Sequence, residues 1–484
     1  MGVKRNFIYS SILTCANYVF PLITYPYVSR VLGVTNIGIC NFVDSIINYF
    51  ILFSMMGVSA VGIREIAGSM NDSQRQSRIF SSLLTLNGIA TFIMLVALFI
   101  SIYVIPELYE HRNLMYIGAA RLVANLFLVE WFFKGTENFK YITNRTILVK
   151  CIYVIAVFLF VKDSSDYPIY FLLLSLMVVV NAVINFIYAC TKIRLTMKDL
   201  MFRPYIKPFV IMGVYMLLTS MYTSFNVAYL GFVSSPDQVG YYTTATKIFT
   251  IILSIYTAFT GVMLPRMSAL YAEGKLDEFK RLIKKSLDLL LSLSIPAVLF
   301  TVLYAPEIIY LISGEGYEGA NLPARIIMPL ILIIGYEQIL VLQVLLPAKQ
   351  DKIVLRNSIL GATTGVILNV ILVSRLQSVG SAVTWLLSEV VVLLTSAYAV
   401  KYLVGLSFPK KTFIKGIIWY IPVVVICCLM ISNFSEHPYL NLLLGILLIG
   451  VYSFFYLYFV SKNEILKSLV KHSFYIFHIS HKEE

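Results

Sequence analysis

The stretch FSSLLTLNGIATFIMLVALFISIYV (residues 80–104) decides the fold, because no charged side chain interrupts a length that can cross a membrane. A helix needs about 20 mostly apolar residues to span the hydrocarbon core of a bilayer. About fourteen spans of this kind follow one another and predict an all-α polytopic membrane protein. The predicted spans are 7–29, 38–62, 80–104, 114–134, 145–162, 168–190, 207–233, 239–264, 284–313, 322–347, 354–374, 378–402, 412–432 and 438–461.

The composition of the 484 residues excludes a soluble domain. Charged residues make up 13% of the chain and hydrophobic residues 59%, whereas soluble domains carry about 25% charged residues. The net charge of +13 would suit a nucleic-acid-binding protein, but membrane topology and anionic lipid headgroups explain it better. We therefore expect membrane lipids, and no nucleic acid, among the partners.

Basic residues concentrate in every second predicted loop, and this pattern orients the chain in the membrane. Of the 38 Lys and Arg residues, 31 lie in these alternate segments. Short cytoplasmic loops accumulate Lys and Arg, so both termini are expected on the cytoplasmic side, with an even number of helices. The basic segments are 4–5, 64–78, 134–150, 192–207, 266–285, 349–356, 401–415 and the tail from residue 462.

Two similar segments, at 32–46 and 230–248, indicate that the chain repeats itself. They lie six predicted helices apart and so insert in the same orientation, which predicts two pseudo-symmetric six-helix lobes around a central cavity. Chance similarity among glycine-rich turns is the alternative. The predicted lobes are 1–206 and 207–405, followed by two further helices in 406–461 and a cytoplasmic tail in 462–484.

Four basic residues inside or at the end of predicted spans are candidate substrate-binding groups. Each lies within about nine residues of the outer end of its helix, and charges at such depth usually face a cavity or a partner. Together they predict a positive chamber that suits a phosphate or a pyrophosphate. The alternative is a set of separate ion pairs, such as Lys247 with Asp44. The four residues are Arg30, Arg121, Lys247 and Arg325.

Three acidic residues inside spans, Asp44, Glu337 and Glu389, are candidates for ion coupling. A carboxyl group buried in a membrane can alternate between a protonated and an ionised form during a transport cycle. Glu337 and Glu389 lie near mid-membrane, and neutral hydrogen-bonded packing is the alternative for both. Glu130 could meet Lys134, one helical turn further on.

No pattern in the sequence indicates an enzyme, a metal site or a cofactor. The histidines and cysteines do not stand at metal-ligand spacing, and no phosphate-binding loop or nucleophile elbow occurs. We therefore predict a protein that is not an enzyme and that uses no cofactor.

Four motifs, in order, resemble the signatures of Wzx-type polysaccharide and O-antigen flippases. These flippases belong to the multidrug/oligosaccharidyl-lipid/polysaccharide exporter superfamily. Arg30 and Lys247 fall inside matching motifs, and one departure is Asn226, near which relatives often carry an acidic residue. The motifs are PLITYPYVSRVLG (21–33), EWFFKGTENFKYIT (130–143), VGYYTTATKI (239–248) and MLPRM (263–267).

The resemblance implies a function and a location. A member would use alternating access to move undecaprenyl-diphosphate-linked oligosaccharide repeat units across the inner membrane of a bacterium. Its further partners would be a polysaccharide polymerase and a chain-length regulator. The competing hypotheses are a multidrug or cation extruder of the same superfamily, which should favour anionic groups, and a membrane glycosyltransferase, which should carry a large external loop.

Overall fold

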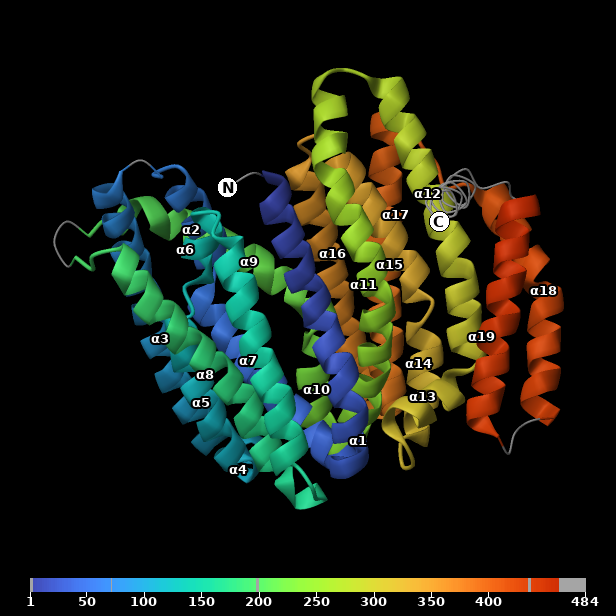
Figure 1. Ribbon diagram of the computed structural model, residues 1–484, viewed down its shortest axis with the longest axis horizontal. Coiled ribbons are helices and arrows are strands. Elements are labelled where there is room, and N and C mark those ends of the chain that lie inside the picture. Colours follow the sequence, from blue (N-terminus) through green and yellow to red (C-terminus); the bar gives the residue numbers. More distant parts are fainter. Residues whose placement is uncertain (1–2, 71, 197–199, 434–436, 461–484) are drawn as a thin grey trace, which may run out of the picture. The chain divides into compact units, whose positions relative to one another are not determined.

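The computed structural model describes residues 3–70, 72–196, 200–433 and 437–460, and the regular structure in these ranges is helical throughout (Figure 1). The predicted all-α membrane fold is confirmed. The predicted tail, 462–484, lies outside the described residues. The chain forms two compact units, which we describe separately.

Unit 1 comprises Met1–Thr244, Ile312–Ala320 and Ala362–Trp385. In it α5 packs against α8, and α7 lies beside both α1 and α8 (Figure 1). Its helices are α1 (Val3–Met55), α2 (Val58–Ala67), α3 (Ser73–Val104), α4 (Pro106–Glu110), α5 (Arg112–Phe127), α6 (Glu130–Gly135), α7 (Phe139–Phe160), η1 (Ser164–Asp166), α8 (Tyr167–Lys192), α9 (Arg203–Thr223), α10 (Phe225–Val233), η2 (Glu318–Ala320), η4 (Asn369–Val373) and the first parts of α11 (Pro236–Ala272) and α17 (Ser374–Val404).

Unit 2 comprises Ala245–Leu311, Asn321–Gly361 and Leu386–Glu484. The two helices beyond the predicted repeats, α18 and α19, both pack against α12. The predicted lobe boundaries stay a prediction. Besides the remaining parts of α11 and α17, unit 2 contains α12 (Leu276–Leu303), α13 (Ala305–Ser313) up to Leu311, α14 (Asn321–Ile327), α15 (Leu330–Gln338), η3 (Ile339–Leu345), α16 (Asp351–Leu368) up to Gly361, α18 (Lys410–Asn433), α19 (Pro438–Phe455) and η5 (Tyr456–Val460).

Eleven segments of the described chain are long and apolar enough to cross a membrane. Two of them, Ile8–Met55 and Asp351–Val404, have 48 and 54 residues, more than twice the roughly 20 that one crossing needs. Each contains a break, at Gly33 (φ 74°) and at Gln377 (φ 52°). The helix count of fourteen stays a prediction.

Helix breaks also change several predicted spans. The span predicted at 114–134 is two helices, α5 and α6, because Val129 adopts a left-handed backbone conformation with φ of 33°. Hydrophobicity could not reveal this break, because Leu128 and Val129 continue the apolar pattern. The break places the motif that begins at Glu130 on a short helix of its own.

Candidate functional site

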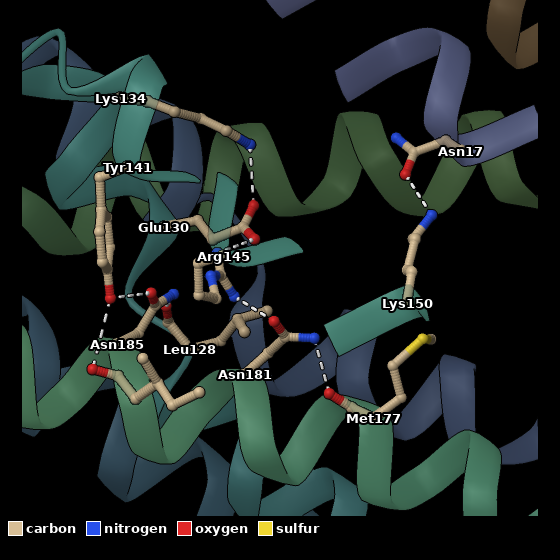
Figure 2. Close-up of polar contacts among 11 residues, drawn as sticks. Asn17, Leu128, Glu130, Lys134, Tyr141, Arg145, Lys150, Met177, Asn181 and Asn185 are labelled. Atoms are coloured by element: carbon tan, nitrogen blue, oxygen red, sulfur yellow. Dashed lines mark hydrogen bonds and ion pairs between the residues drawn. The ribbon is translucent and has the colours of Figure 1, made fainter. Parts of the chain in front are cut away.

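The turn between α5 and α6 positions Glu130 inside unit 1. Asn185 on α8 donates its side-chain amide to the backbone carbonyl of Leu128, with a nitrogen–oxygen distance of 2.5 Å. Tyr141 on α7 donates in turn to the Asn185 side-chain oxygen at 3.1 Å. Since a carbonyl freed at a helix end needs a new donor, these side chains stabilise the break (Figure 2).

Glu130 bridges two cations. One carboxylate oxygen accepts from Arg145 at 3.1 Å, and the other lies 3.2 Å from the Lys134 Nζ (Figure 2). Arg145 also donates to the Asn181 side-chain oxygen at 2.7 Å, and only 4% of its side chain is exposed. The predicted contact of Glu130 with Lys134 is confirmed, but Arg145 is the more deeply buried partner.

Lys150 is a second cation on α7. Its Nζ donates to the Asn17 side-chain oxygen on α1 at 2.7 Å (Figure 2). The same atom lies 5.8 Å from the ring centroid of Phe20. The charge pattern counts Arg145 and Lys150 in the basic segment 134–150, and both also fall in the predicted span 145–162. The helix α7 that carries them begins at Phe139, six residues before that span.

Arg121 is paired within unit 1. It donates to Asp44 and to the Asn48 side-chain oxygen, each at 2.5 Å, and Asn48 donates to Asp44 at 2.8 Å. The side chain of Arg121 is 10% exposed, whereas that of Asp44 is 34% exposed. Asp44 therefore has a cationic partner on α5, and the alternative pairing with Lys247 is not needed to neutralise it.

The other three predicted cations are not among the described partners of Asp44. Arg30 is exposed on α1, with its side chain against Gly314. Lys247 is partly buried on α11 in unit 2. Arg325 is exposed on α14 and donates to the Val302 carbonyl at 3.2 Å. Because two of the four candidates belong to each unit, a chamber that combines them all stays a prediction.

Glu307 on α13, outside the eleven apolar segments, lies near Arg325 in unit 2. Burial raises the pKa of this carboxyl, and the positive charge of Arg325 and a hydrogen bond from Asn441 at 3.1 Å partly offset the effect. Asn441 belongs to α19, so this contact connects one of the two additional helices to the rest of unit 2. The surroundings of Arg325 therefore include a carboxyl group as well as a backbone carbonyl.

Glu337 and Glu389 meet within unit 2. Their carboxyl groups lie close enough to interact, and Glu389 is only 3% exposed. Polar groups continue beside this pair, since Gln338 accepts from Thr260 at 3.0 Å and donates to Thr257 at 3.2 Å.

The segments predicted to be repeats contact each other in unit 1. A Cβ on Gly38 would overlap the Pro236 carbonyl, and a Cβ on Gly240 would overlap the Val34 carbonyl. Only glycine, which has no Cβ, permits so close an approach. Three hydrogen bonds reinforce this α1–α11 contact, joining Thr35 to Asp237 at 2.5 Å, Asn41 to Thr243 at 3.2 Å and Tyr25 to Thr244 at 2.7 Å.

Asn226, the departure from the family pattern, belongs to a network of neutral groups. It is fully buried, donates to the Tyr242 hydroxyl at 3.2 Å and accepts from Asn369 at 2.7 Å. Neutral partners satisfy both ends of the amide. Asn226 lies on α10, whereas the carboxyl pair of Glu337 and Glu389 lies on α15 and α17.

Known proteins resemble the chain in sequence and in fold. It is 26% identical over 401 residues to the "Putative O-antigen transporter" of Escherichia coli (strain K12), covering 81% of this chain and 95% of that protein. A protein of the same name from Shigella dysenteriae is 24% identical and is covered in full by an alignment spanning 82% of this chain.

Two solved structures share the fold. The lipid II flippase MurJ in an inward closed conformation matches with a TM-score of 0.77 and 14% identity, over 93% of this chain and 98% of that one. An inward-facing MATE transporter of the MOP superfamily matches with a TM-score of 0.57 and 15% identity, over 80% and 95%. Residues 3–271 match the family described as polysaccharide biosynthesis protein. This match confirms the predicted relationship, and the chain belongs to the polysaccharide biosynthesis protein family.

Proposed function

We propose that the chain is a flippase for undecaprenyl-diphosphate-linked oligosaccharides, working by alternating access through a cationic cavity. The observation that carries the proposal is the set of basic side chains inside membrane helices, in a fold shared with a lipid II flippase. Moving a diphosphate across hydrocarbon without help is prohibitive because the charge loses its hydration. A path lined by cations replaces that hydration.

The relatives support a bacterial setting. Those of similar length are named as O-antigen transporters, which suits a lipid-linked glycan substrate at the inner membrane. The charge distribution of the loops supports cytoplasmic termini, and hence an α1–α11 contact at the outer face. A polymerase and a chain-length regulator would act on the glycan after it has crossed.

The charge inside unit 1 argues against the extruder alternative. On α5 and α7 the cations Arg121, Arg145 and Lys150 lie within membrane helices. Asp44 and Glu130 are both engaged by such cations. A site for cationic drugs would need an excess of negative charge, whereas the described groups give an excess of positive charge.

Arg30→Ala and Lys247→Ala are each expected to reduce surface glycan at near-normal protein abundance. Each change removes a cation that would stabilise the diphosphate along the path. Glycan export in a strain that lacks its own flippase is the measurement, with membrane protein quantified by immunoblot. Arg30→Lys would separate point charge from bidentate geometry. Normal export in the double alanine variant would exclude both residues from the path.

Glu337 and Glu389 are proposed as the proton-coupling pair. Glu337→Gln is expected to leave lipid-linked glycan binding intact while export no longer responds to an imposed pH gradient, because an amide cannot take up or release a proton. Transport in vesicles with and without the gradient is the measurement, and Glu315→Gln, at an exposed position, is the control. An unchanged gradient response in both Gln variants of the pair would refute the coupling role and leave the flippase proposal standing.

A further inference from the structure

Lys150 lies near the middle of the apolar segment Phe139–Phe160, which is long enough to cross a membrane. It is the twelfth residue of the 22-residue helix α7, which places it about 16 Å along a helix of about 33 Å. A charged side chain at the centre of a bilayer costs about 2.5–3.5 kcal/mol even on permissive scales, and such residues usually serve a function. The position of Lys150 therefore requires a compensating interaction.

The described contacts of Lys150 are with neutral groups. An amide oxygen of Asn17 accepts its hydrogen bond, and the ring of Phe20 lies beneath it. The nearby Glu130 has one oxygen on Arg145 and the other on Lys134, so its single negative charge serves two cations already. The cluster in Figure 2 consequently carries three positive charges against one negative charge.

The surroundings of this pair favour an aqueous cavity over lipid. Asn17 is exposed and Lys150 is partly buried, and both come from the middle of membrane helices. If they faced lipid, these two polar side chains would lose their hydration at that depth, and no other polar group would replace the water. Facing a hydrated path, they present an ammonium group and an amide donor to a passing anion.

We propose that Lys150 and Asn17 form a mid-membrane anion subsite that binds the diphosphate of the lipid-linked substrate. This proposal rests on the flippase function proposed above. When the diphosphate arrives, the Lys150 Nζ exchanges the Asn17 oxygen for a phosphate oxygen, and the Asn17 amide nitrogen is then available as a second donor. Arg145, held by Glu130 and Asn181, adds a fixed positive charge behind the subsite.

Binding of undecaprenyl diphosphate to the purified full-length protein in nanodiscs tests this assignment. Lys150→Gln is expected to weaken binding about tenfold, since it removes a charge-assisted hydrogen bond, whereas Lys150→Arg should stay within about threefold because it keeps the charge. Lys140→Gln, at an exposed position of the same helix, is the matched control and should bind normally. Neutral undecaprenol should bind all variants alike.

Asn17→Asp separates a binding role from a purely structural one. If Lys150 merely anchors α7 to α1, a carboxylate at position 17 strengthens the contact, and diphosphate binding stays at the wild-type level. In an anion subsite the same carboxylate repels the diphosphate, and we expect a loss of about tenfold or more. Competition by inorganic pyrophosphate would support the subsite, whereas equal competition by phosphatidylglycerol vesicles would assign it to bulk lipid and overturn the proposal.

The failure of this proposal and of the proposed function can be told apart. Wild-type protein that binds undecaprenyl diphosphate no better than undecaprenol would contradict the flippase function itself. Wild-type binding that Lys150→Gln and Asn17→Asp leave unchanged would overturn only the subsite. Melting temperatures of all variants, measured in the same nanodiscs, would show whether any loss reflects unfolding.

Discussion

A chain carrying both Thr35→Cys and Asp237→Cys is expected to lose glycan export to the background level when oxidised and to recover it with a reductant. The Thr35 and Asp237 oxygens lie 2.5 Å apart, beside the close approaches at Gly38 and Gly240. In the proposed alternating-access cycle, this α1–α11 contact opens when the substrate leaves at the outer face. A covalent bridge across it would hold the contact shut.

The measurement is surface glycan in cells exposed to a membrane-impermeant oxidant and then to a reductant. Each single cysteine variant is the control, because six native cysteines are present and could form unrelated bridges. Bridge formation is followed by the changed mobility of the protein on a non-reducing gel. Full export by bridged protein would show that this contact does not open during transport.

Glu130→Ala is expected to destabilise the protein by about 3–5 kcal/mol, because it leaves the buried Arg145 without its counter-charge. Arg145 has 4% of its side chain exposed, and Lys134 has 34%, so Arg145 suffers most of the loss. We expect little folded protein on size-exclusion chromatography in detergent and a markedly lower melting temperature. Export should fall in proportion to the folded protein.

Two variants test whether the lost counter-charge of Arg145 causes the destabilisation. Adding Arg145→Met to Glu130→Ala removes the buried positive charge that has lost its partner. The double variant should recover a large part of the lost melting temperature, since an apolar replacement of a buried ion pair is often tolerated. Glu273→Ala breaks the ion pair with Lys275, whose side chains are 53% and 60% exposed, and should change stability by less than about 1 kcal/mol. Equal effects of Glu130→Ala and Glu273→Ala would contradict a buried role for Glu130.

These contacts give a physical reason for the motif that begins at Glu130. Trp131, Phe132 and Phe133 are buried in one hydrophobic cluster of unit 1. Glu130 meanwhile joins α6 to Arg145 on α7. A single short helix thus combines apolar packing with the counter-charge for a buried arginine, and both depend on the break at Val129.

The sequence by itself determined the class of fold and the family. Apolar runs of membrane-spanning length leave no alternative to helices, because backbone polar groups in lipid must be satisfied within the helix. The motif order from residue 21 to residue 267 identified the family. The contact of Glu130 with Lys134 also followed from sequence, because residues four apart lie on one helix face.

Only the tertiary structure decided the partners of the charged residues. Arg121 reaches Asp44 across 77 positions of the chain, and Lys150 reaches Asn17 across 133, distances over which helical periodicity carries no information. The break at Val129 was equally hidden, since apolar residues continue through it. Helix packing selects which faces meet, and so it determined that Arg145 and Lys150 of α7 have partners on α6 and α1 and that close approaches at two glycines bring α1 and α11 into contact.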